Sequence, residues 1–190
     1  MPALFQQGME AGISRRGFLR SSALLCALPL AATSLPLSAS PESGSRRLSF
    51  LHTHTSERLS VTYFDRGAYV PESLGQVRNL FRDFRSGQVH EIDTGLLDIL
   101  YDLQRLADRE GRFEIISAYR SPGTNAQLRS RSTGVAEKSL HLSGRAIDVR
   151  LPGVPPRRLA ELARGLQRGG VGFYASSDFV HVDTGRVRYW

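Results

Sequence analysis

The chain turns and enters a buried strand within the stretch Ser139-Leu140-His141-Leu142-Ser143-Gly144-Arg145-Ala146-Ile147-Asp148-Val149. Gly144 supplies the backbone freedom for the turn after His141. In the strand that follows, Asp148 points to the face opposite its apolar neighbours Ile147 and Val149. Because an unpaired carboxylate is costly to bury, we expect a metal or another cation beside Asp148.

A second histidine lies in another strand of buried type, Phe179-Val180-His181-Val182-Asp183. Neighbouring antiparallel strands lie about 4.8 Å apart, so His181 can approach the point where His141 and Asp148 meet. Two imidazoles and one carboxylate are the ligand set of a catalytic zinc whose fourth position is open for water. Once an N-terminal segment that contains Cys26, the single cysteine, is removed, no thiolate ligand remains. We therefore expect one Zn²⁺ per chain, bound by His141, Asp148 and His181.

The order of strands and helices around these stretches indicates an α+β fold, which we expect to be a small antiparallel sheet with flanking helices. His52-Thr53-His54-Thr55 joins two strands of a predicted hairpin, where the histidines either line a cleft or stand at the hairpin edge. Apolar residues at helical spacing predict helices that begin at Pro71, at Asp93 or Thr94, and at Thr124, and a further helix around residues 159–166. Further strands are predicted at residues 113–117, 146–149, 171–174 and 179–183.

The N-terminus resembles a twin-arginine export signal. Arg15-Arg16 precedes Phe18-Leu19 and a short apolar run at residues 23–32. A membrane span needs about 20 apolar residues, so we expect no stable span after cleavage. Cleavage near residues 32–40 and retention of the segment as an anchor both stay open. We expect a signal peptide at 1–40, a linker at 41–46 and one functional domain at 47–190, located in the periplasm.

Composition limits the classes of function. The chain is 41% hydrophobic and 23% charged, as in an ordinary globular protein, and its net charge is +7. A basic balance suits either nucleic acid or an anionic wall polymer. The sequence has no recognisable nucleic-acid motif and no basic platform with interleaved aromatic residues, so we expect no nucleic-acid partner.

A known family shares the central motif. Residues 139–148 fit the pattern S-x-H-x-x-G-x-A-x-D, and a later histidine follows an acid by three residues. This combination resembles the zinc D-alanyl-D-alanine metallopeptidases, whose fold is shared with the hedgehog signalling domain. Ser117-Ala118-Tyr119-Arg120-Ser121 and the tail from Asp178 to Gly185 add to the likeness. From about 48 to 190 the chain is similar to the periplasmic murein endopeptidase branch.

The resemblance implies a role for each matching position. The two histidines and Asp148 are the zinc ligands, in agreement with the residue chemistry. Asp178 matches the general base, and Arg120 matches an arginine that stabilises the oxyanion or holds a substrate carboxylate. Ser139 either hydrogen-bonds the substrate or orders its loop. Asp183 competes with Asp178, because it can orient a ligand imidazole or be the base itself.

The activity implied by the resemblance is zinc-dependent hydrolysis of peptide crosslinks in peptidoglycan. Its partners are then the peptidoglycan stem peptides and, before export, the twin-arginine machinery. Direct crosslinks between diaminopimelate residues are the first expected target, and D-alanyl crosslinks are the second. Two alternatives stay open: a D,D- or L,D-carboxypeptidase on the same polymer, and a zinc-containing wall-binding module without catalysis.

Overall fold

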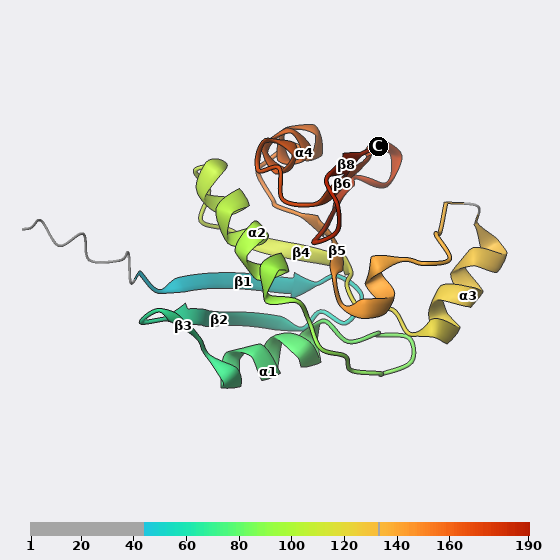
Figure 1. Ribbon diagram of the computed structural model, residues 1–190, viewed down its shortest axis with the longest axis horizontal. Coiled ribbons are helices and arrows are strands. Elements are labelled where there is room, and N and C mark those ends of the chain that lie inside the picture. Colours follow the sequence, from blue (N-terminus) through green and yellow to red (C-terminus); the bar gives the residue numbers. More distant parts are fainter. Residues whose placement is uncertain (1–43, 133) are drawn as a thin grey trace, which may run out of the picture. The chain divides into compact units, whose positions relative to one another are not determined.

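The computed structural model describes residues 44–132 and 134–190, and the predicted signal peptide lies outside this range. One sheet of eight strands runs in the order β3-β2-β1-β4-β5-β7-β6-β8 (Figure 1). The strands are β1 (Arg46–His52), β2 (Arg58–Asp65), β3 (Ala68–Tyr69), β4 (Arg112–Ser117), β5 (Ala146–Arg150), β6 (Gly170–Tyr174), β7 (Phe179–Asp183) and β8 (Arg188–Tyr189). The helices are α1 (Pro71–Leu80), α2 (Thr94–Leu106), α3 (Pro122–Arg131) and α4 (Pro156–Gly165). Arg46, the last residue of the predicted linker, already pairs with Phe64 in β1, so the predicted linker extends one residue too far.

The fold is α+β as expected, but the expectation of a small antiparallel sheet is wrong. The sheet is mixed, because β1 pairs with β4 in parallel and β6 pairs with β8 in parallel. The chain between β1 and β4 contains the β2–β3 ribbon, α1 and α2, and so long a connection allows two strands to run in the same direction. The predicted hairpin of β1 and β2 is confirmed as an antiparallel pair.

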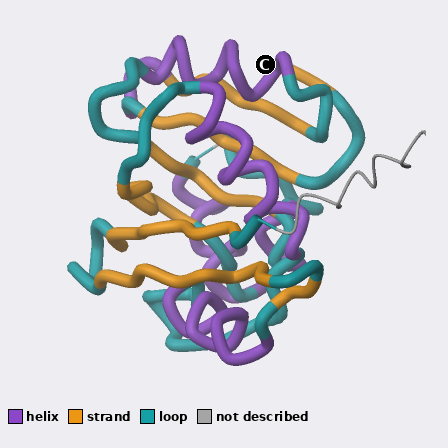
Figure 2. The backbone as a smooth tube through the Cα atoms, turned by 90° about the vertical axis from the view of Figure 1, so that its left-hand side faces the viewer, coloured by secondary structure: helices purple, strands orange, loops and turns teal. Residues whose placement is uncertain are grey.

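A single apolar core lies between the helices and one face of the sheet. Alternate residues of the central strands enter it, such as Phe50, Ile115, Val149 and Val180, each with 0% exposure. Residues of α1, α2 and α4 belong to the same cluster. Figure 2 shows these helices (purple) packed against the strands (orange). The side chains at the other positions of β5 and β7 therefore lie on the face away from this core, and they include Asp148 and His181.

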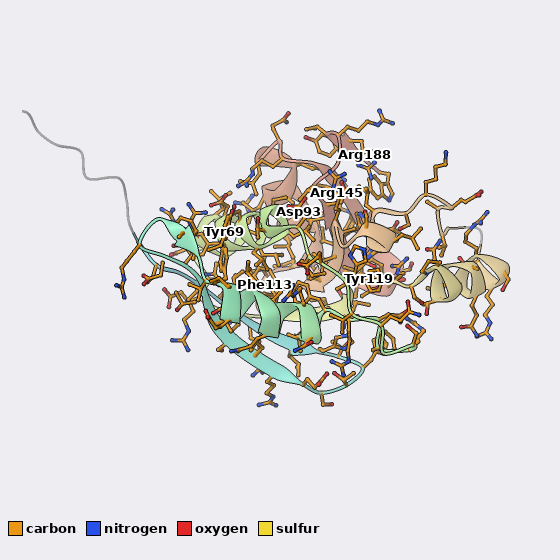
Figure 3. The ribbon with its side chains drawn as sticks, turned by 60° about the horizontal axis from the view of Figure 1, so that its bottom comes forward. Tyr69, Asp93, Phe113, Tyr119, Arg145 and Arg188 are labelled. Atoms are coloured by element: carbon orange, nitrogen blue, oxygen red, sulfur yellow. The ribbon has the colours of Figure 1, made fainter. Side chains whose placement is uncertain are left out.

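Capping residues set where the helices begin. Of the two predicted starts, Asp93 is the cap of α2, and its Oδ1 accepts a hydrogen bond from the Gly95 amide at 2.9 Å. The same carboxylate lies 3.6 Å from the Arg145 guanidinium, a pair visible in Figure 3, so α2 is tied to the turn before β5. The helix predicted from Thr124 begins earlier, because Ser121 is its cap and Pro122 its first residue. Within the described residues no helix is long and apolar enough to cross a membrane.

Candidate metal centre

Three predicted ligands meet where two strands and a short 3-10 helix come together. His141 lies in this helix, η1 (Leu140–Ser143), which ends at Gly144 in the left-handed conformation with φ of 66°. A Cβ on Gly144 would lie 2.0 Å from the Glu91 carbonyl oxygen, so only glycine fits the turn. Asp148 on β5 stands directly opposite His181 on β7. The turn that the sequence predicted at Gly144 is confirmed.

The ligand atoms have the spacing of a metal site. His141 Nε2 lies 3.3 Å from His181 Nδ1 and 3.4 Å from Asp148 Oδ1, and the latter two atoms are 2.8 Å apart. Metal–ligand bonds of about 2.0–2.1 Å in a tetrahedron place neighbouring ligand atoms about 3.3 Å apart. All three residues are buried, and their ligand atoms lie within 4.8 Å of one another. The cluster therefore fits a divalent metal held by nitrogen and oxygen ligands.

A backbone carbonyl orients His141. Its Nδ1 lies 2.6 Å from the Ala118 oxygen, so Nδ1 carries the proton and Nε2 presents its lone pair to the cluster. Burial lowers the pKa of His141, although Asp148 acts in the opposite direction. The neutral imidazole that results is the form that binds a metal.

A carboxylate orients His181. Its Nε2 lies 3.0 Å from Asp183 Oδ2, which leaves Nδ1 directed at the cluster. Asp183 is itself fully buried and accepts hydrogen bonds from the Gly170 and Gly185 amides and from Arg188. Burial alone would lower the pKa of His181, but its bonds to Asp148 and Asp183 raise it. Of the two roles weighed for Asp183, the structure supports orientation of the imidazole, because no oxygen of Asp183 lines the cavity.

Arg120 holds the outer oxygen of Asp148. Its Nη2 lies 2.8 Å from Asp148 Oδ2, and its Nε donates to the Ser117 hydroxyl at 2.9 Å. The register of β4 shifts between Ile115 and Ser117, and this irregularity places Ser117 opposite Asp148. Burial alone would raise the pKa of Asp148, but His141 and His181 hold it well below its ordinary value. Asp148 is therefore a buried carboxylate that keeps its charge.

A cavity of about 350 Å³ opens onto the three ligands. Among the described residues, basic and aromatic side chains line it, and Asp148 is its only carboxylate. The wall includes Arg120, Lys138, Arg188, Tyr174, Phe179 and Trp190. An anionic ligand with apolar parts suits such a wall.

The structure does not bring Asp178 to this cavity. Asp178 follows a short 3-10 turn in the left-handed conformation, with φ of 55°. Its side chain is 65% exposed, and its Oδ2 lies 3.2 Å from Arg150 Nε. The residue lies just outside β7, and it is not among the residues that line the cavity. The sequence-based assignment of Asp178 as general base therefore has no support from its position.

Three further residues singled out in the sequence differ in their surroundings. Ser139 lines the cavity and caps η1, accepting a hydrogen bond from the His141 amide at 3.4 Å, which fits its predicted loop-ordering alternative. His52 is buried and His54 stacks on Phe84, with ring centroids 4.2 Å apart. Neither histidine lines the cavity, so the hairpin-edge alternative describes them better.

Sequence reasoning missed Arg188 and Trp190. Both lie at the end of the chain, on or just after the short strand β8, which no apolar alternation predicted. A signal was present in Gly170-Val171-Gly172, where alternate glycines on one strand indicate the close approach of other groups.

Comparison with known proteins identifies the family of the chain. A family model described as "Peptidoglycan L,D-endopeptidase MepK" matches residues 40–190. The protein of that name from Escherichia coli (strain K12) is 41% identical over 145 residues, which are 76% of this chain and 80% of the relative. The "Probable peptidoglycan L,D-endopeptidase MepK" of Haemophilus influenzae is 43% identical over 146 residues, 76% of this chain and 78% of the relative. No solved structure matched the chain.

The fold and the three-ligand site define the class of protein, a peptidase with a candidate metal centre. Within that class, the chain belongs to the peptidoglycan L,D-endopeptidase MepK family. The resemblance to murein endopeptidases, which the motif at residues 139–148 first indicated, is thereby confirmed.

Proposed function

We propose that this protein hydrolyses peptide crosslinks in peptidoglycan, with one Zn²⁺ held by His141, Asp148 and His181. The convergence of these three buried ligand atoms on one cavity carries the proposal. The similarity to proteins named L,D-endopeptidases favours a bond from an L-centre to a D-centre. A direct crosslink between two diaminopimelate residues contains such a bond, and D-alanyl crosslinks are the second candidate.

Contacts behind the ligands direct one ring nitrogen of each histidine at the cluster. The Ala118 carbonyl and the Asp183 carboxylate each accept from the outer nitrogen of one histidine, which directs the inner nitrogen at the cluster. Arg120 occupies Asp148 Oδ2 and leaves Oδ1 facing the histidines. A bound zinc ion supplies a water of lowered pKa and polarises the scissile carbonyl.

Arg120 also serves the substrate in this proposal. A guanidinium has five N–H donors, and the contacts with Asp148 and Ser117 use only two. The remaining donors on the cavity wall can stabilise the negative oxygen of the tetrahedral intermediate, an effect of about 3–4 kcal/mol per donor. They can equally hold a carboxylate of the stem peptide. Ser139, on the same wall, contributes by holding η1 and with it His141.

The proposed location is the periplasm, after export through the twin-arginine pathway. The match to the family begins at residue 40, where the predicted signal peptide ends. The polymer to be cut lies in the periplasm, so the proposed location and the proposed substrate agree.

Digestion of purified sacculi tests the activity. We expect the zinc-loaded protein to convert crosslinked muropeptide dimers to monomers, a chelator to stop the reaction and added zinc to restore it. Chromatography of the products follows the dimer fraction. The matched control is His181→Ala, which removes one ligand and should leave the dimers intact.

Other outcomes select the alternatives. Release of terminal amino acids with persisting dimers would identify a carboxypeptidase. Unchanged sacculi with zinc fully bound would identify a wall-binding module and overturn the proposal.

A further inference from the structure

The side chains of Arg188 and Trp190 reach the metal centre across β6, at positions where β6 carries only glycine. Arg188 lies on β8, and Trp190 lies two residues further along the chain. Both are beside β6, and the ligand strand β7 lies on the other side of β6. A Cβ on Gly170 would lie 2.5 Å from Arg188 Nη1, and a Cβ on Gly172 would lie 2.6 Å from Trp190 Cε2. A side chain at either position would displace Arg188 or Trp190, so the two glycines leave the space in which both side chains cross β6.

The crossing places each side chain at a different part of the site. Arg188, labelled in Figure 3, ends on Asp183, with its Nη2 2.6 Å from Oδ2. The Trp190 ring lies beside the ligand imidazole of His181, with centroids 5.3 Å apart. Arg188 thus completes the support of His181, and the indole forms part of the cavity wall.

The indole is fixed but not covered. Its Nε1 donates to the Tyr174 hydroxyl at 2.9 Å. The Trp190 backbone is paired with β6: its amide donates to the Val171 carbonyl at 3.2 Å, and its carbonyl accepts from the Phe173 amide at 3.0 Å. Even so, Trp190 is 46% exposed. A rigid aromatic surface that stays half exposed beside a metal ligand is suited to contact a bound molecule.

The aromatic wall continues away from the ligands. Tyr174 stacks on Phe179 with ring centroids 4.6 Å apart, and both line the cavity with Trp190. Arg120 and Lys138 supply positive charge to the same cavity. The cavity therefore suits a ligand that carries an aliphatic segment together with carboxylates.

We propose that Trp190, with Tyr174, forms a subsite for the aliphatic side chain of the amino acid next to the scissile bond. This inference rests on the proposed function and adds a residue that determines substrate specificity. The ring adjoins a metal ligand, so it contacts groups within about one residue of the reacting carbonyl, at the 3.3–3.6 Å per residue of an extended chain. The glycan is separated from that carbonyl by the earlier stem residues, so the peptide is the part that reaches the indole.

Fluorescence provides a direct test, because Trp190 is the only tryptophan of the chain. The probe is the uncrosslinked stem peptide, the reaction product, added to the zinc-loaded protein. We expect a saturable change in tryptophan emission with this peptide and none with glycan chains stripped of peptide. An emission that responds only to glycan, or to neither, would overturn the proposal.

Kinetics on crosslinked muropeptides separate binding from chemistry. Trp190→Ala should raise KM about 10- to 50-fold through lost apolar contact, with kcat changed only a few fold. Trp190→Phe, which keeps an aromatic face, should recover part of the loss. Gly172→Ala, which displaces the indole, should shift KM in the same direction. The control is Tyr189→Ala, because Tyr189 is 42% exposed on the same strand but bonds to Arg164 outside the cavity.

Two results of these experiments would contradict the role proposed for Trp190. An unchanged KM in Trp190→Ala, or metal loss in both Trp190 variants, would reduce Trp190 to a structural role. If the wild-type protein cuts no crosslink, the proposed function fails, whereas the emission test still reports whether Trp190 contacts the stem peptide.

Discussion

At the scale of single residues, the site depends on how its ligands are held as much as on the ligands themselves. Asp183 is buried among four donors and keeps its charge, since His181 and Arg188 hold its pKa below the ordinary value despite burial. A carboxylate that accepts from a ligand imidazole fixes the ring and strengthens it as a ligand. Asp183 lies two residues from His181, so the sequence predicted that the two side chains could pair. Only the structure, in which Asp183 is buried, favours orientation of the imidazole over proton transfer.

We expect Asp183→Asn to weaken zinc affinity about 10- to 100-fold, because the amide is a poorer acceptor for His181 Nε2. Competition with a zinc-binding dye measures this affinity. Asp98→Asn is the matched control, because Asp98 accepts from Arg46, Tyr63 and Tyr69 outside the metal centre. Equal losses in both variants would mean that Asp183 acts through general stability alone.

Asp178 gives a second prediction at this scale. Its carboxylate contacts Arg150 near the surface, and exposed pairs contribute only about 0–1 kcal/mol. We therefore expect Asp178→Ala to keep kcat/KM within a few fold of wild type, and Arg150→Ala to match it. A drop of about 10²–10⁴-fold confined to Asp178→Ala would instead reinstate Asp178 as the general base, since general-base catalysis has that magnitude.

At the scale of elements, the loop after α1 supports the segment that carries Arg120. Asp83 is buried and accepts from the Ser121 amide at 2.9 Å, the Ser121 hydroxyl at 2.6 Å and the Arg85 amide at 3.0 Å. Although burial opposes it, these bonds hold the pKa of Asp83 far below its ordinary value. Ser121 in turn caps α3, so one carboxylate fixes both the loop and the helix start.

We expect Asp83→Asn to lower the free energy of unfolding by about 2–3 kcal/mol at neutral pH. The NH₂ group of asparagine would face the Ser121 or the Arg85 amide, a donor with which it cannot form a hydrogen bond. The folded pKa is depressed, so the stabilisation by Asp83 is present above the unfolded value of about 3.9 and is lost as pH falls through the folded pKa. The gap between wild type and variant should therefore narrow below about pH 4 in urea titrations. Asp65→Asn, which changes an exposed carboxylate, should show no gap. A gap independent of pH would contradict the assignment.

The same scale shows what the sequence can and cannot predict. The alternation of Phe179 to Asp183 predicted both the strand and the face of His181, because the side-chain period of a strand is local. The parallel pairing of β1 with β4 was missed, because strand partners depend on contacts across some 60 residues of chain that no local pattern records. The helix predicted to begin at Pro71 does begin there, but local spacing did not predict its end at Leu80, beyond which Phe84 stacks on His54.

At the scale of the whole molecule, the way the metal centre is assembled is consistent with the predicted export signal. The three ligands come from η1, β5 and β7, so the metal centre forms only when the sheet has assembled. The twin-arginine pathway carries folded proteins, and a domain exported in this way can acquire its metal before it leaves the cytoplasm. A metal site that needs the assembled sheet therefore favours a twin-arginine signal at Arg15-Arg16 over an ordinary secretory signal.

A fusion of residues 1–45 to a reporter tests this reading, and we expect export only in cells that have the twin-arginine machinery. Arg15→Lys together with Arg16→Lys should abolish export, because the lysine pair keeps the positive charge and removes only the guanidinium groups. Cell fractionation measures the reporter in the periplasm. A variant with Arg46→Lys and Arg47→Lys in the full chain is the control, since these arginines lie in β1, and its export should equal that of the wild type. Export of the fusion in cells without the machinery would show that the general secretory route reads the segment, and the charge-preserving double variant would then be exported as well.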